Sequence, residues 1–155
     1  MKIRLLISGK IENKNADALA ELYLKRIKHY LPITVEIIKP EKIKSLSKAE
    51  ILNREAAKFM ERLKESDFSV VMDKDGKQIM SEDFSEFFVR LAGQSTKQIT
   101  FVVGGPLGLS PNAKMKANQI LSFSKMTFPH ELAIVMLLEQ IYRAQSILRG
   151  EKYHK

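Results

Sequence analysis

A glycine-rich junction follows an apolar, β-branched run in the second half of the chain. Ile99–Val103 leads directly into Gly104–Gly108, which reads GGPLG. Glycine permits tight turns and a close approach of the backbone to a ligand, and loops after the carboxyl ends of strands are the usual ligand position in open α/β sheets. The spacing matches neither the dinucleotide motif G-x-G-x-x-G nor a P-loop. At this point a structural turn and a ligand-binding loop are equally supported.

A second unusual segment, Leu121–His130, reads LSFSKMTFPH. It mixes small hydroxyl side chains with apolar ones, and its Phe-Pro-His end cannot continue a regular helix or a central strand. Such a loop can offer backbone amides and carbonyls to a purine edge between apolar walls. The alternative is an irregular connection whose phenylalanines fill the core, and the residues taken alone favour that alternative.

Several enzyme classes are excluded by what the chain lacks. There is no cysteine among the 155 residues, which rules out disulfides, thiolate metal sites and a cysteine nucleophile. His29, His130 and His154 do not have metal-ligand spacing, so we expect no bound metal. No Ser-His-Asp set can be assembled. His130, directly before the last expected helix, is a candidate N-cap or RNA contact rather than a catalytic base.

The length and charge of the chain suggest one domain and a polyanionic partner. A chain of 155 residues without repeats or Pro/Gly/Ser linkers fits a single domain over residues 1–155. The net charge of +8 and the pI near 9.6 favour phosphate contacts, although a solvated basic surface explains them equally well. The apolar runs Ile3–Ile7 and Ile134–Leu138 are too short for a signal peptide or a membrane span. We therefore expect a soluble cytoplasmic protein.

The elements that position these segments alternate between strands and helices, as in an α/β sheet. The expected strands cover residues 3–7, 33–38, 68–72, 99–103 and 120–124. The expected helices cover residues 16–30, 47–64, 81–91, a short stretch from 111, and 131–148. A lysine-rich loop is expected at 39–48. Asp73–Gly76 resembles part of a calcium loop, but its glycine comes too early for one, so we interpret it as a turn.

Caps and apolar faces support these helices. Ser47 and Glu50 have capping-box spacing, Ser110 before a proline marks a helix start, and Ser81 is expected to cap another helix. On the first helix we expect one apolar face, formed by Leu19, Tyr23, Ile27 and Tyr30. The last helix is apolar nearly all round, which indicates burial on more than one side and a subunit interface.

Four ordered segments resemble those of one known family. They are Val102–Leu109, Leu121–His130, Glu139–Ala144 and Gly150–Lys155, and together they are similar to the ribosomal RNA large subunit methyltransferase H family. The resemblance extends over the whole chain, and the Pro106-Leu107 pair lies at a variable position. It implies membership of the SPOUT superfamily: a parallel-rich α/β sheet flanked by helices, a C-terminal trefoil knot and a homodimer.

The resemblance also implies an activity and a donor site. The activity is methylation of N3 of a pseudouridine in 23S ribosomal RNA, with S-adenosylmethionine as methyl donor. Matching the motifs position by position, the implied donor contacts are Met72, Gly104, Phe123, Ser124, Lys125, Met126, Thr127 and Phe128. Gly105 and Gly108 are implied to shape the same pocket.

Residues near the C-terminus become candidates for handling the RNA. His130, Arg143, Tyr153 and His154 carry the ring and cationic groups that RNA sites use. An interface ion pair is a nearly equal alternative for Arg143, and a frayed terminus is the alternative for the last residues. For the whole chain, the alternatives are an RNA-binding relative without catalysis, a methyltransferase for another RNA, or a nucleotide enzyme. The assembled ribosome is the favoured substrate, because so small a domain has no separate RNA-binding module.

Overall fold

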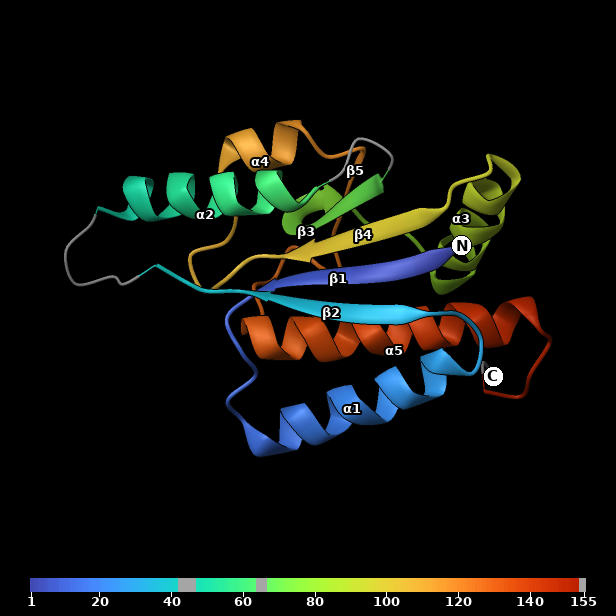
Figure 1. Cartoon of the computed structure of the whole chain (residues 1–155). Coiled ribbons are helices and arrows are strands. Elements are labelled where there is room, and N and C mark those ends of the chain that lie inside the picture. Colours follow the sequence, from blue (N-terminus) through green and yellow to red (C-terminus); the bar gives the residue numbers. More distant parts are fainter. Residues whose placement is uncertain (42–46, 64–66, 154–155) are drawn as a thin grey trace.

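Five strands form one parallel sheet at the centre of the structure, a computed structural model that describes residues 1–41, 47–63 and 67–153 (Figure 1). The strands are β1 (Lys2–Ser8), β2 (Ile33–Ile38), β3 (Asp67–Lys77), β4 (Gln98–Val103) and β5 (Gln119–Leu121). Their order in the sheet is β2-β1-β4-β3-β5, and every neighbouring pair is parallel. The predicted α/β architecture is confirmed, and β4 lies at the centre of the sheet.

Helices cover both faces of this sheet. They are α1 (Lys14–Lys28), α2 (Lys48–Arg62), α3 (Ser81–Gly93), α4 (Pro111–Met115) and α5 (His130–Leu148). In Figure 1, α2 and α4 lie over one face, while α1 and α5 lie over the other and α3 packs against α5. Among the helices that the structure describes, none is long and apolar enough to cross a membrane.

The central strands β1 and β4 are buried on both faces and so contribute to two cores. Successive side chains of a strand point to opposite faces, so Leu5 and Phe101 join the core under α1, α3 and α5. Their neighbours Leu6 and Val102 join the core under α2, which includes Phe59. Burial on both faces explains why these strands read as continuous apolar runs rather than as alternating patterns.

Two of the predicted helix starts are confirmed. The Ser47 hydroxyl accepts the Glu50 N–H at 3.3 Å, and the Glu50 carboxylate accepts the Ser47 N–H at 2.8 Å, which completes the capping box. Ser110 caps α4, with Pro111 at the first helical position. The helix after Ser47 was expected to reach residue 64, but it ends at Arg62; residue 64 and residues 42–46 of the expected loop lie outside the described residues.

Two other helix starts differ from the prediction. α1 begins at Lys14, two residues early, because the Asn13 side chain accepts two first-turn amides at 2.9 and 3.1 Å. Ser81 is not an N-cap: Met80 holds that position, and the Ser81 hydroxyl donates to the Gln140 Oε1 at 2.8 Å. The Ser81 side chain, which the local pattern assigns to capping, is therefore used in a hydrogen bond between α3 and α5.

The turn expected at Asp73–Gly76 is instead an irregular part of β3. The strand continues to Lys77, yet Met72 and Lys77 are both paired with Leu121, so the four residues between them leave the register. A Cβ atom on Gly76 would lie 2.6 Å from the Leu121 carbonyl carbon. The close passage of β3 and β5 at this point explains the glycine.

The apolar face expected on the first helix is only partly correct. Ala20, Leu24 and Ile27 are the buried residues of α1, whereas Leu19 is 46% exposed. Leu132 of the last helix, which the sequence predicts to be buried on more than one side, is also 45% exposed. The sequence predicts a subunit interface on α5. Exposed leucines on these two adjacent helices are consistent with such an interface, which would bury them.

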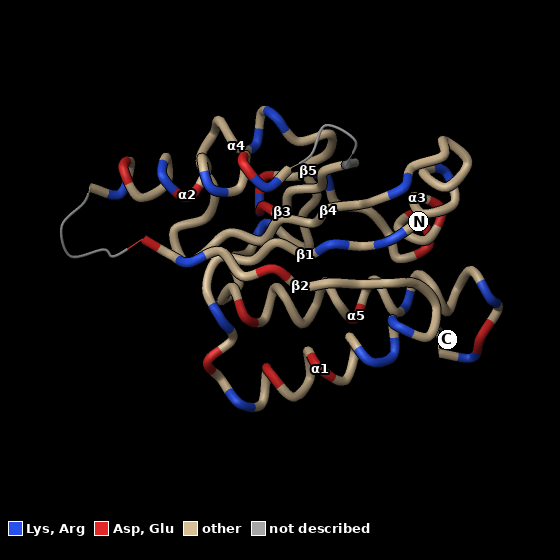
Figure 2. Tube along the Cα trace, in the orientation of Figure 1, with Lys and Arg blue, Asp and Glu red and all other residues tan. Residues whose placement is uncertain are grey.

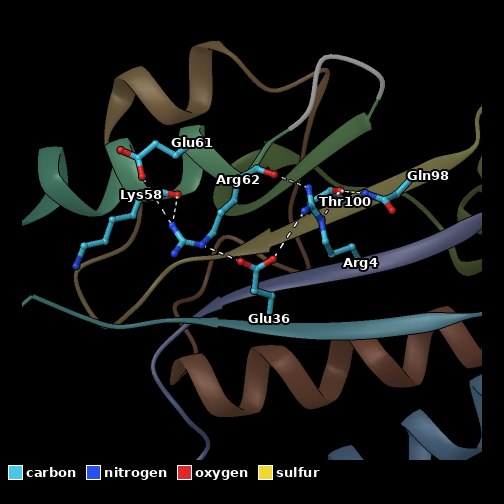
Figure 3. A network of polar contacts seen from close by, with 7 residues as sticks. All are labelled: Arg4, Glu36, Lys58, Glu61, Arg62, Gln98 and Thr100. Carbon is cyan, nitrogen blue, oxygen red and sulfur yellow. Dashed lines mark hydrogen bonds and ion pairs between the residues drawn. The ribbon is translucent and has the colours of Figure 1, made fainter.

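Part of the positive charge has a structural role. In Figure 3, the Arg62 Nε donates to Glu36 at 2.8 Å, and Arg4 donates to the Arg62 carbonyl at 2.6 Å and to the Thr100 hydroxyl at 3.3 Å. These contacts join the end of α2 to β1, β2 and β4. Figure 2 shows Lys and Arg interspersed with Asp and Glu along both helical layers. The charge excess is therefore not confined to one face.

Candidate functional site

The strand register brings the implied donor residues to one edge of the sheet. Met72 of β3 pairs with Val103 on one side and with Leu121 on the other. Gly104 directly follows Val103, and the LSFSKMTFPH segment begins at Leu121. Since the carboxyl ends of parallel strands share an edge, Met72 and the starts of both loops are neighbours. The two unusual segments of the sequence thus meet, although twelve residues that include α4 lie between them in the chain.

The glycine segment forms a tight closed turn. The Gly108 N–H donates to the Gly105 carbonyl at 2.9 Å, and Gly108 has a φ of +79°. A Cβ atom on Gly104 would lie 2.7 Å from the Gly108 carbonyl oxygen and 2.8 Å from a Leu109 side-chain carbon. No side chain fits at Gly104 without opening the turn, and both Gly104 and Gly105 are buried.

The second loop is held by its own hydroxyls. The Ser122 N–H donates to the Lys77 carbonyl at 2.9 Å, and the Ser122 hydroxyl lies 2.8 Å from the Ser124 carbonyl. The Ser124 hydroxyl accepts the Met126 N–H at 3.1 Å. Phe123, Ser124 and Phe128 are half-buried, while Lys125, Met126 and Thr127 are exposed. Ser122 and Ser124 therefore order the backbone of this loop, and the Ser122 N–H ties it to β3.

A cavity of about 450 Å³ opens beside this loop. Met72 and Phe123, both implied donor contacts, line it together with Tyr23 of α1 and Glu139 of α5. Its walls are mainly apolar with a few polar groups, as in small-ligand sites. The three glycines of the turn and residues 124–128 are not part of its lining, so the structure divides the implied donor set between the cavity wall and the adjoining loops.

Arg143 and Tyr153 meet on one carboxylate. Glu139 accepts the Arg143 Nε at 2.9 Å and Nη2 at 2.5 Å, and it accepts the Tyr153 hydroxyl at 3.1 Å. The Tyr153 hydroxyl also lies 3.3 Å from that of Tyr23. Glu139 raises the pKa of Arg143, and burial, followed by the hydrogen bond with Tyr23, raises the pKa of Tyr153. Both groups therefore keep their protons at neutral pH.

Glu151 and Tyr153 are held by contacts with residues in or next to α1 and α5. The Tyr153 ring packs edge-on against Tyr142 with centroids 4.6 Å apart, and the Arg143 guanidinium lies 4.9 Å from the Tyr153 centroid. The Tyr30 hydroxyl donates to Glu151 at 2.6 Å, and this hydrogen bond is the main cause that raises the pKa of Tyr30 to about 12. A frayed end is thus wrong for Tyr153. The ion pair of Arg143 lies within its own helix.

The two histidines of the RNA-handling set are placed differently. His130 is the first residue of α5, and Pro129 is its N-cap, so the expected capping role of His130 is wrong. Arg143 is thirteen positions after His130 on this helix, which places them about 20 Å apart along its axis. The structure therefore does not bring His130 to the Arg143–Tyr153 pair. His154 lies outside the described residues.

Sequence reasoning missed Glu139 as a site residue, and it missed a buried carboxylate, Glu55, near the glycine turn. Glu139 shares a motif with Arg143 four residues later, a spacing that predicts an ion pair on one helix face. Glu55 lies in a helix rich in charged residues, and nothing in that pattern indicates burial. Among the described residues, no three His, Cys, Asp or Glu side chains gather as a metal site.

Known proteins resemble this chain over its full length. A family profile described as "Predicted SPOUT methyltransferase" matches residues 1–154. "Ribosomal RNA large subunit methyltransferase H" of Dictyoglomus thermophilum is 40% identical over 154 residues, 99% of either chain. The protein of that name from Clostridium botulinum strain Loch Maree is 44% identical over 161 aligned positions, covering all of both chains.

Solved structures share the fold at much lower identity. A probable methylase family protein from Haemophilus influenzae superposes with a TM-score of 0.56 at 14% identity, over 99% of this chain and 70% of that one. A probable methyltransferase from Bordetella pertussis gives 0.56 at 11% identity, over 93% and 96%. The family profile and the full-length sequence matches show that the chain belongs to the SPOUT methyltransferase family and, within it, to the ribosomal RNA large subunit methyltransferase H group.

Proposed function

We propose that this protein transfers a methyl group from S-adenosylmethionine to N3 of a pseudouridine in 23S ribosomal RNA. One observation carries the proposal: the pairing of Met72 with both Val103 and Leu121, which joins the two family motifs at one edge of the sheet. Full-length identities of 40% and 44% to proteins named ribosomal RNA large subunit methyltransferase H support the RNA target.

The residues at this edge fit the methyl donor. Met72 and Phe123 offer apolar surface to an adenine ring, and Ser124–Phe128 offer backbone polar groups. The turn at Gly104, Gly105 and Gly108 offers backbone without side chains to the ligand, and a Cβ atom on Gly104 would have no space within the turn. When bound, S-adenosylmethionine supplies a methyl group that its sulfonium centre already activates. The chain has mainly to orient the donor and the base and to exclude water.

Arg143 and Tyr153 are proposed to hold the target RNA. The ion pair with Glu139 orients the guanidinium, a planar cation of the kind that recognises phosphate groups. The Tyr153 ring can stack on a base. His130 and His154 complete the proposed RNA-handling set, with His130 acting from the donor-loop end of α5.

We also propose a homodimer with a C-terminal trefoil knot. Leu19, Leu22 and Leu132 are each more than 40% exposed on α1 and α5, the helices beside the cavity. A second copy packed there would bury these leucines and close the cavity. We place the proposed knot in the path after β5, where Ser122 hydrogen-bonds to Lys77 and the chain then passes from the α4 side of the sheet to the α5 side (Figure 1).

The proposed substrate is the assembled ribosome, in the cytoplasm. The test is transfer of tritiated methyl groups to 70S ribosomes lacking this methylation, with separate subunits and free 23S RNA as comparisons. Labelling of 70S particles above all others supports the proposal. Labelling of a different RNA would assign the enzyme another target, and donor binding without any labelling would refute this substrate. A protein that binds ribosomes but not the donor would be an RNA-binding relative without catalysis.

A further inference from the structure

Glu55 is the one charged side chain that is buried among the described residues. Its exposed fraction is 6%, although it lies in the middle of α2, whose other charged residues face solvent or surface ion pairs. Burial of a carboxylate is costly unless hydrogen bonds satisfy it. Its two oxygens accept the Ser8 hydroxyl at 3.2 Å and the Glu41 backbone N–H at 3.3 Å. The donor and RNA contacts described above make no use of this group.

The same pair supports the glycine turn. Ser8 ends β1, which lies beside β4 in the sheet, and its exposed fraction is 2%. A Cβ atom on Gly105 would lie 3.0 Å from the Ser8 hydroxyl oxygen and 3.7 Å from a Glu55 carboxylate oxygen. The backbone of the turn at Gly105 therefore packs against the Ser8 side chain, and Glu55 holds that side chain by accepting its hydroxyl hydrogen.

We infer that Ser8 and Glu55 are positioning residues for the methyl donor. This inference rests on the proposed function. Ser8 and Glu55 hold the backbone of Gly104 and Gly105 in the position where it contacts the bound donor. A site that is displaced because its supporting residues have moved loses affinity even when every contacting residue is intact. The pair acts through the turn, so its effect appears in donor binding before any RNA is present.

The test compares two substitutions in the same helix. Glu55→Ala leaves the Ser8 hydroxyl and the Glu41 amide without their acceptor, so the Kd for S-adenosylmethionine, measured by calorimetric titration, should rise about tenfold. Glu50→Ala is the control, because it removes the capping box of α2 and lowers the melting temperature without touching the turn. Its Kd should equal that of the wild type.

A conservative variant separates positioning from charge. In Glu55→Gln the amide oxygen can still accept the Glu41 N–H, and Ser8 can accept from the amide nitrogen because a hydroxyl both donates and accepts. Its Kd should stay within about twofold of wild type. If Glu55→Ala and Glu50→Ala lower the melting temperature alike and both bind the donor normally, Glu55 only stabilises α2 and the inference is wrong. Failure of the wild-type protein to bind the donor would instead refute the proposed function.

A double-mutant cycle covers the case in which Glu55→Ala does not fold. Gly105→Ala places its methyl group against the Ser8 oxygen, whereas in Ser8→Ala the nearest remaining atom is the β-carbon at 3.4 Å. The loss of donor affinity caused by Gly105→Ala should therefore be smaller in the Ser8→Ala background. Additive changes in binding free energy would contradict the inference, since residues without a shared contact add.

Discussion

Glycines in this chain differ in what a side chain would meet. At Gly104 a methyl group would lie 2.7 Å from the Gly108 carbonyl oxygen, whereas at Gly93 it would meet nothing within 4 Å. We expect Gly104→Ala to open the turn and weaken donor binding by at least about tenfold, since about 1.4 kcal/mol is enough for that change. Gly93→Ala is the matched control and should bind normally. Equal Kd values in calorimetry for both variants would show that the turn does not contact the donor.

Arg143 and Arg149 allow a second comparison of single residues. Both lie over a tyrosine ring, Arg143 over Tyr153 and Arg149 over Tyr30, but only Arg143 is held by Glu139 at the cavity. We expect Arg143→Ala to slow methyl transfer by about a hundredfold, because a misplaced RNA loses its alignment. Donor affinity should not change, and Arg149→Ala should transfer normally. If single-turnover assays gave the same rate of methyl transfer for both variants, Arg143 would have no role in holding the RNA.

Among the elements, α2 offers the clearest test of a local sequence signal. Ser47→Ala should lower the free energy of unfolding by about 1 kcal/mol in urea denaturation, the usual cost of losing an N-cap. Hydrogen bonds from Ser47 lower the pKa of Glu50 below its ordinary 4.5. A group with a lowered folded pKa stabilises above its unfolded pKa and loses this effect as the pH falls. The difference between wild type and Ser47→Ala should therefore shrink below pH 4.5; a pH-independent difference would contradict the capping-box account.

The elements also show where sequence reasoning succeeds and where it ends. Strand runs and caps such as Ser47 and Ser110 depend on neighbours a few residues away, so they can be predicted from local pattern. The local pattern predicts a buried Leu19 and a capping Ser81. The structure has an exposed Leu19 and a Ser81 bonded to Gln140 of another helix, because the packing of helices decides these surroundings. The irregular end of β3 depends on β5, more than forty residues later. The motifs that resemble the family indicate which segments are candidates for the donor site, but the burial of Glu55 near the turn has no local signature.

At the scale of the whole molecule, the exposed leucines of α1 and α5 test the dimer. Leu132→Lys places a charge in the proposed interface, so light scattering should show a shift from dimer to monomer. Val89→Lys on α3 is the control, because Val89 is 55% exposed and lies outside the α1–α5 face. A monomeric wild type, or a dimer unchanged by Leu132→Lys, would place the subunit contact elsewhere or exclude it.

The proposed function is defined by the atom and the nucleoside that receive the methyl group. Ribosomes that lack the modification would be incubated with the protein and isotopically labelled S-adenosylmethionine, and their 23S RNA digested to nucleosides for mass spectrometry. We expect one labelled species, pseudouridine methylated at N3, from a single position in the RNA. Label in any other nucleoside, or none under conditions where the protein binds the donor, would contradict it.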